Sequence, residues 1–308
     1  MVAYLIRRSL HGLLVIFLVS IVTFGIMQIA PGNPIDVMVG QARVSQEQID
    51  QIKHKWGLDR PWYEQYFTWA GNIARGDFGK SVVRTSVPVS TMVRQAAGVT
   101  IKLNAASFLL STIIAIPVGI LAAIRRNSIF DYVAAVGSTL GVALPSFWIS
   151  LMLIILFSLK LGWLPPNGTQ SWKNFILPVA VLSAQETALL ARLTRGATLE
   201  ILRQDYVTTA RSKGLSEFVI VLRHVVRNAL LPVITVLGLR LAFMLSGTIV
   251  VETVFGMPGL GRLFIDSVFR LDYQVIQAIV LISSLVVVVM NILTDLMYAY
   301  VDPRIRIR

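Results

Sequence analysis

The 308-residue sequence contains no cysteine, which excludes disulfide bonds, thiolate metal sites and cysteine nucleophiles. Charged residues are also scarce, at 14% of the chain, against roughly 25% in an average soluble domain. Hydrophobic residues make up 55% of the sequence, and the mean hydropathy is +0.71. Because so apolar a chain has too little polar surface to face water, the composition predicts an integral membrane protein.

The chemistry of enzymes and metal sites has little support in the sequence. The three histidines, His11, His54 and His224, lie far apart, and no Ser/His/Asp or paired-carboxylate constellation occurs at short spacing. The run ARGDFGKS (74–81) lacks the first glycine of a phosphate-binding loop and follows no predicted strand. The sequence therefore predicts a chain that is not an enzyme and binds neither a metal nor a nucleotide itself.

Six stretches are long and apolar enough to cross a bilayer, which takes roughly 20 residues at about 1.5 Å each. They lie at about 9–30, 100–123, 132–158, 174–192, 228–251 and 276–300. Pro117 and Pro145 fall inside the second and third stretches, where neighbouring helices can satisfy the freed carbonyl groups. We therefore expect an all-α integral membrane fold of six transmembrane helices: an N-terminal anchor helix at 1–30, a mostly helical extracytoplasmic loop domain at 31–99 and a five-helix core at 100–308.

Lys and Arg are concentrated on one side of the predicted membrane, which in membrane proteins is the cytoplasmic side. Segments on this side hold 14 basic residues, whereas the two short loops on the other side hold four. The fourteen are Arg7, Arg8, Arg125, Arg126, the seven from Arg192 to Arg227, Arg304, Arg306 and Arg308. The pattern predicts that both termini are cytoplasmic. It also explains the net charge of +12 without a nucleic-acid partner.

The long outer loop has features of its own. Ser45 and Gln48 match a capping box and predict a helix that ends near Gly57. An aromatic-rich stretch, WYEQYFTW, follows at 62–69. Two interpretations of that stretch stay open, a belt at the membrane interface or a docking surface for an external partner.

The inner segment between the fourth and fifth stretches reads as a helix, a tight turn and a second helix. Gly214 suits the position after a helix C-terminus, and Ser216 can cap the next helix. Apolar residues recur at helical spacing on both sides of the turn, at Leu199, Leu202, Tyr206, Ala210, Phe218, Val221, Leu222 and Val225. Such a basic, amphipathic segment either lies on anionic lipid or inserts into a cytoplasmic partner.

The run DYVTTARSKGL (205–215) is similar to the cytoplasmic coupling loop of ABC-importer permeases. Other stretches match the peptide-type branch: GDFGKS, ARLTRG (191–196), RNALLPV (227–233), VVETVFGMPGLGRL (250–263) and DLMYAYVDPRIR (295–306). Over nearly its whole length the chain resembles the B-type permease of dipeptide and oligopeptide importers, a pattern that nickel and glutathione permeases share. It departs from the general consensus at Thr208 and Thr209, where that consensus has Glu and Ala.

The resemblance implies a type I importer fold in the cytoplasmic membrane of a prokaryote. A second homologous permease, two cytoplasmic ATPase subunits that bind ATP and Mg, an extracytoplasmic binding protein and membrane lipid would be its partners. Segment 199–222 would couple this chain to one ATPase. The matching coupling residues are Asp205, Tyr206, Ala210, Arg211, Lys213, Gly214 and Leu215. Cargo other than peptide, namely nickel, glutathione or another small solute, remains an alternative, as does an ion-coupled secondary transporter.

Charges within the spans mark either a pair or a pathway. Arg240 and Glu186 either pair with each other or with the second permease, or Arg240 faces the pore and attracts a peptide carboxylate. Glu252 at the outer end of the fifth span contacts the cargo amine or the binding protein, or caps a turn. A bent or re-entrant segment follows it, and its marker residues are Phe255, Pro258, Gly259 and Gly261.

Overall fold

The computed structural model describes residues 2–29, 47, 51, 54, 59–84, 87–242 and 248–301. These residues are almost entirely helical, and their only β pairing is an isolated antiparallel bridge between Lys80 and Pro88. The helix expected between Ser45 and Gly57 lies largely outside the described residues. The chain divides into two compact units, one of Met1–Thr100, Leu245–Ile249 and Pro258–Arg308, the other of Ile101–Met244 and Val250–Met257.

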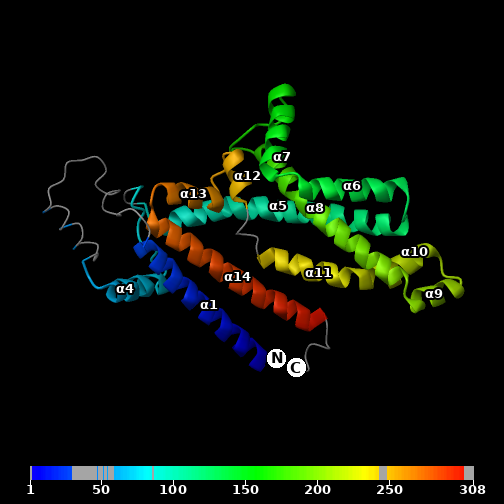
Figure 1. The fold of residues 1–308 in the computed structure, drawn as a ribbon, viewed down its shortest axis with the longest axis horizontal. Coiled ribbons are helices and arrows are strands. Elements are labelled where there is room, and N and C mark those ends of the chain that lie inside the picture. The colour runs from blue at the N-terminus through cyan, green and yellow to red at the C-terminus, as the bar shows by residue number, and fades with distance from the viewer. Residues whose placement is uncertain are drawn as a thin grey trace. The chain divides into compact units, whose positions relative to one another are not determined.

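In the first unit, helices α1 (Val2–Ile29) and α14 (Tyr273–Val301) run side by side (Figure 1). Gly12 permits their close approach, because a Cβ atom there would lie 2.6 Å from a methyl group of Val288. Helix α13 (Leu260–Phe269) and the first residues of α5 (Val89–Ile124) pack against α14. Their buried core consists of Val89, Met92, Val93, Ala96, Leu260, Val275, Ala278 and Ile279.

The GDFGKS run forms a turn that is fastened to the start of α14. Gly76 and Gly79 adopt positive φ angles of 80° and 75°, which glycine alone takes without strain. The Ser81 hydroxyl and the Val82 N–H both donate to the buried carboxylate of Asp272. This segment therefore has a structural role, because it is held against the start of α14.

The aromatic-rich stretch forms α4 (Trp62–Ala74), and one face of it packs on α1. The Tyr66 hydroxyl is hydrogen-bonded to Ser20 at 2.8 Å, and the Phe24 ring lies 5.5 Å from the rings of both Tyr66 and Trp69. The opposite face, with Trp62 and Phe67, is exposed. Both interpretations of the aromatic stretch stay open for that exposed face.

The second unit consists of the rest of α5 and a series of shorter elements in which α8 is central. It contains α6 (Ile129–Ala143), α7 (Ser146–Leu153), the π-helix η1 (Ile154–Lys160), α8 (Lys173–Leu202), α9 (Asp205–Ser212), α10 (Glu217–Val219), the π-helix η2 (Ile220–Val226), α11 (Arg227–Ala242) and most of α12 (Ile249–Val254). Helix α8 packs against both α6 and α11. Its residues Leu190 and Ala191 share a buried core with Ala115 of α5 and are flanked by Val236 of α11.

The membrane-spanning segments agree with the expected six in number. Among the described residues, five helices are long and apolar enough to span a bilayer, and a pair of bent helices, counted as one span, brings the number to six. They are Ile6–Ile29, Val89–Ile124, Ile129–Ala143 with Ser146–Lys160, Lys173–Leu202, Glu217–Leu241 and Tyr273–Thr294. The fifth span was expected to continue to residue 251, but residue 248 is not helical and α12 is a separate helix that begins at Ile249.

The third span differs from its expectation, because the stretch 132–158 is broken at Pro145 by a bend of 104°. Leu144, the residue before this proline, takes an extended conformation with ψ of 129°, as the proline ring favours. The side-chain amide of Gln185 on α8 donates to the Leu144 carbonyl at 3.3 Å. The carbonyl that the break frees therefore has a hydrogen-bond partner. A backbone carbonyl in the apolar interior of a membrane requires one.

Candidate functional site

The inner segment has the predicted helix–turn–helix form and is anchored to the end of α8. Val207 and Ala210 of α9 are buried against Ile220 and Val225 of η2, with Ile201 and Leu202 of α8 packed on the same cluster. Among the predicted coupling residues, Ala210 thus contributes to packing inside the segment rather than to its surface. The cluster thus packs α9 against both α8 and η2.

The turn at Gly214 confirms the predicted end of the first helix. Gly214 has a φ of 77°, the Gly214 N–H donates to the Arg211 carbonyl at 2.9 Å, and the Leu215 N–H donates to the Ala210 carbonyl at 3.4 Å. These two bonds form a Schellman motif. Ser216 precedes α10, but its side chain makes no capping hydrogen bond.

An ion pair spans the same turn. Arg211 Nε donates to Glu217 Oε1 at 2.7 Å and Arg211 Nη2 to Glu217 Oε2 at 3.3 Å, so α9 and the start of α10 are joined by a bidentate pair. This hydrogen bonding raises the pKa of the Arg211 guanidinium above its ordinary value. The turn is therefore held by side chains as well as by the backbone.

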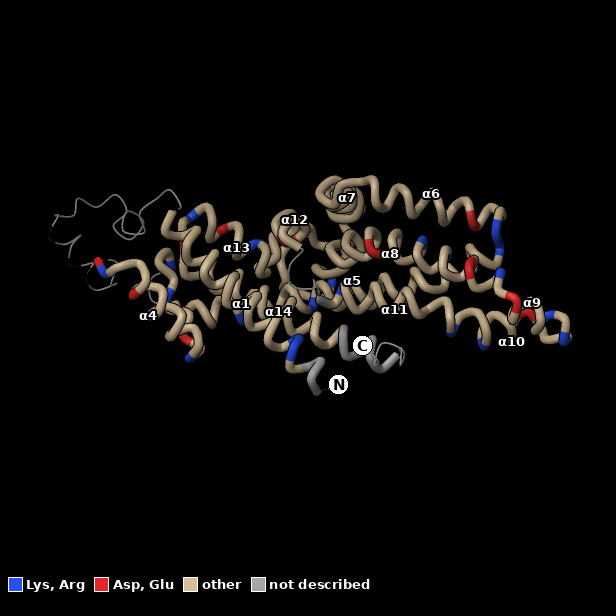
Figure 2. The backbone as a smooth tube through the Cα atoms, turned by 60° about the horizontal axis from the view of Figure 1, so that its bottom comes forward, with Lys and Arg blue, Asp and Glu red and all other residues tan. Residues whose placement is uncertain are grey.

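The outward surface of the segment is both apolar and charged. The Phe218 side chain is 75% exposed, and Tyr206, Leu215 and Leu222 are exposed as well. Charged residues of the second unit gather at the end that carries α9 and α10 (Figure 2). Asp205 and Lys213 are among the exposed ones. Large apolar side chains rimmed by charges are typical of an interaction site.

Arg240 and Glu186 lie together, as one of the two hypotheses held. Arg240 Nη1 is 3.6 Å from Glu186 Oε1, and the Ser111 hydroxyl donates to Glu186 Oε2 at 3.1 Å. The Arg240 side chain is 34% exposed and that of Glu186 is 25% exposed. The pairing with each other is therefore observed, and the partial exposure of both side chains leaves the hypothesis of a pore-facing Arg240 open.

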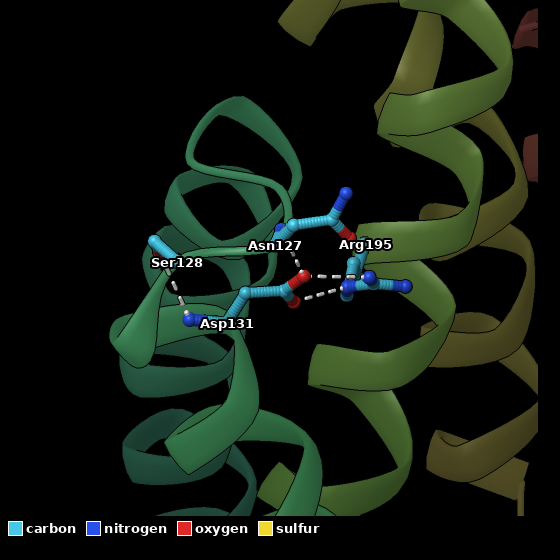
Figure 3. Close-up of polar contacts among 4 residues, drawn as sticks. All are labelled: Asn127, Ser128, Asp131 and Arg195. Carbon is cyan, nitrogen blue, oxygen red and sulfur yellow. Dashed lines mark hydrogen bonds and ion pairs between the residues drawn. The ribbon is translucent and has the colours of Figure 1, made fainter.

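A second and tighter pair, which the sequence did not reveal, joins Asp131 of α6 to Arg195 of α8 (Figure 3). Arg195 Nε and Nη2 donate to the two carboxylate oxygens at 2.6 and 2.8 Å, and the Asp131 side chain is only 5% exposed. The Asn127 N–H also donates to Asp131 Oδ2, at 3.0 Å. The Ser128-x-x-Asp131 spacing matches a capping box and predicts the start of α6, but it says nothing of the arginine.

The outer motif near Glu252 is buried. Glu252, Phe255 and Met257 have almost no exposed surface, and Gly256 has a φ of 61°. Gly259 and Gly261 lie at the start of α13, where a Cβ atom on Gly261 would come within 2.7 Å of the Ile249 backbone. Full burial of the Glu252 carboxylate favours its structural role in this conformation.

Comparison with solved structures assigns the fold. A chain of a structure titled "Inward facing conformations of the MetNI methionine ABC transporter" aligns with a TM-score of 0.59 and 19% identity, over 71% of this chain and 100% of the other. A chain titled as an amino acid ABC transporter with histidines aligns with a TM-score of 0.54 and 19% identity, over 68% and 93%. The fold is that of type I ABC-transporter permeases.

Sequence comparison then gives the family. Residues 115–307 match the family described as "Binding-protein-dependent transport system inner membrane component", and residues 1–95 match its N-terminal counterpart. The chain belongs to this family of ABC-importer permeases. It is 42% identical to the oligopeptide transport system permease protein AppB of Bacillus subtilis and 40% identical to the glutathione transport system permease protein GsiC of Escherichia coli K12, in each case over 99% of both chains.

Proposed function

We propose that this chain forms half of the membrane pore of an ATP-driven importer of short peptides and is driven through α9 and α10 by a cytoplasmic ATPase. The observation that carries the proposal is the exposed surface of this helix–turn–helix. Its apolar side chains, Phe218 above all, project from a backbone that is fixed by a Schellman turn and by the Arg211–Glu217 pair. A preorganised surface loses little conformational entropy on docking.

The remaining subunits follow from this role. A second permease completes the pore, two ATPase subunits bind ATP and Mg beneath it, and a binding protein delivers cargo to the outer face. Both termini then lie in the cytoplasm, as the distribution of Lys and Arg supports. Residues 1–30 serve as an anchor, 31–99 face the binding protein on the outside, and 100–308 form the core permease with its coupling segment at 199–222.

Peptide cargo is supported by the printed names of the relatives, one for oligopeptides and one for glutathione, which is itself a tripeptide. Within the spans, Arg240 and Glu186 present a cation and an anion with open flanks. These charges complement the carboxylate and the amine of a peptide. We place them in the cargo pathway and assign Glu252, which is fully buried here, to the support of that pathway.

The proposal is tested by affinity purification of the tagged chain from its native host in mild detergent. We expect a second permease and two ATPase chains to co-purify. Gly214→Ala should weaken recovery of the ATPases, because alanine at a φ of 77° strains the turn by about 1 kcal/mol. Gly162→Ala is the matched control, since Gly162 has a φ of 65° and the same open surroundings but lies between η1 and α8.

The control variant should retain the ATPases at the wild-type level. Equal loss in both glycine variants would mean that the change acts through general stability and would count against the coupling role. Recovery of the chain alone, together with cargo flux driven by an ion gradient in liposomes, would contradict the importer and support a secondary transporter.

A further inference from the structure

Helix α8 connects three features that are separate in the sequence. Its C-terminal end carries the cluster that holds α9, Arg195 lies seven residues earlier, and Glu186 lies nine residues before that. At about 1.5 Å per residue these intervals are roughly 10 and 14 Å. A displacement of α9 that travels along α8 passes the Asp131–Arg195 pair before it reaches the Arg240–Glu186 pair.

Helix α6 is fastened to α8 at three levels. The Asp131–Arg195 pair joins the beginning of α6 to α8. Gly141 brings the two helices so close that a Cβ atom there would lie 2.8 Å from the Ala188 Cβ, and Gln185 holds the Leu144 carbonyl at the other end of α6. Of these contacts, the ion pair alone is charged and bidentate.

The carboxylate is fixed independently of the arginine. The Asn127 N–H donates to it from a turn in which Asn127 has a φ of 62°, and the Ser128 side chain accepts from the Asp131 N–H at 3.3 Å (Figure 3). Apolar helix contacts tolerate small sliding, whereas a bidentate Arg–carboxylate pair loses its hydrogen bonds when they lengthen by about 1 Å. The pair thus fixes the register between α6 and α8.

We propose that Asp131 and Arg195 are positioning residues for energy coupling: they make α6 and α8 move as one body, so that ATPase-driven displacement of α9 reaches the cargo pathway. The inference rests on the proposed function. Without the pair, α8 shifts against α6, so α6 no longer shares the displacement that α8 carries to Glu186. ATP hydrolysis then continues without matching transport.

The first experiment uses the complete complex in liposomes with its binding protein and measures peptide imported per ATP hydrolysed. Arg195→Gln should lower this ratio by about fivefold or more, the lower range of typical coupling between sites, while stimulated ATP hydrolysis stays within about twofold of wild type. Arg192→Gln, an exposed arginine three residues earlier on α8, is the matched control and should leave the ratio unchanged.

The second experiment separates the role of the pair from folding. The chain has no cysteine, so D131C/R195C introduces the only two. A short bis-methanethiosulfonate reagent bridges them covalently, and a reductant removes the bridge from the same folded protein. The bridged complex should import several times more peptide per ATP than the reduced one, and the same reagent should have no effect on the complex with the unsubstituted chain.

A wild-type ratio in Arg195→Gln, or equal ratios before and after reduction of the bridge, would overturn the inference. Parallel loss of hydrolysis and import in Arg195→Gln, with no recovery on bridging the cysteine pair, would also overturn it, because the pair would then be structural only. A wild-type complex without ATP-dependent import would contradict the proposed function itself, and this inference with it.

Discussion

The two ion pairs on α8 differ in nearly every physical respect. The Asp131–Arg195 pair has two short hydrogen bonds, and its carboxylate is buried and held by a further backbone N–H. The Arg240–Glu186 pair has a separation of 3.6 Å, and both partners are partly exposed. Both pairs place an arginine beside a carboxylate within a membrane protein, so residue type alone does not distinguish their roles. The geometry of each pair and the accessibility of its side chains distinguish the two roles.

From this comparison we propose that one helix serves two purposes. A tight, buried pair resists motion and fixes two helices in register. A long, accessible pair binds its partners weakly and leaves them free to exchange for a solute. Substitutions in the two pairs test this difference, and the largest effect is expected at Arg195.

The Asp131–Arg195 pair should dominate stability. Arg195→Gln leaves a nearly buried carboxylate without its cation, and we expect a loss of about 3 kcal/mol in the free energy of unfolding. Thermal unfolding in detergent measures the loss. The double variant D131N/R195Q removes both charges and should recover most of it. If the double variant is as unstable as Arg195→Gln, the cost does not come from the unpaired charge.

The Arg240–Glu186 pair should dominate cargo recognition instead. We expect Arg240→Gln to change stability by less than about 1 kcal/mol, because the pair is long and partly exposed. It should raise the KM for a peptide with a free carboxyl terminus by about tenfold, the loss of one charge-assisted hydrogen bond.

Uptake assays with free and amidated forms of one peptide check this expectation. The amidated form should be affected much less by the substitution. No change in either stability or uptake on Arg240→Gln would remove this residue from the pathway.

Substitution of Ser111 should have the smallest and most specific effect on stability and uptake. Its hydroxyl is the second partner of Glu186, and Ser111→Ala should lower the free energy of unfolding by about 1 kcal/mol. Uptake should fall by less than about twofold, because the arginine remains to orient the carboxylate. Unfolding and uptake measured side by side test this, and a tenfold loss of uptake would show that Ser111 itself contacts cargo.

The sequence predicted the number of spans because each apolar run is long enough by itself, but it did not predict how prolines would act. Pro117, Pro178 and Pro232 lie inside continuous helices, whereas Pro145 ends α6 and begins a bend of 104°. The difference depends on partners distant in sequence, such as Gln185 at the Leu144 carbonyl. The local sequence pattern around a proline does not indicate such partners.

The same distinction separates the parts of the site. The end of α9 at Gly214 follows from local backbone rules and was predicted. The pairing of Arg240 with Glu186 was one of two hypotheses, because charges deep in spans are few. Arg195 was one of many basic residues on the predicted cytoplasmic side, and nothing near it in the sequence points to Asp131, 64 residues away. Only the packing of α6 on α8 brings them together.

Gly119 of α5 and Gly141 of α6 lie where these helices approach α8 closely, and they limit which substitutions the protein tolerates. A Cβ atom on Gly119 would lie 2.6 Å from the Ala191 carbonyl oxygen and 3.0 Å from the Arg195 backbone nitrogen. Helix α8 is also held to α6 by Asp131 and by the close approach of Gly141. An added methyl group on Gly119 would therefore require α5 to move away from a helix that is already fixed to α6. Variation in this region is confined to outward-facing positions, and a glycine here is exchanged only together with the residues it touches.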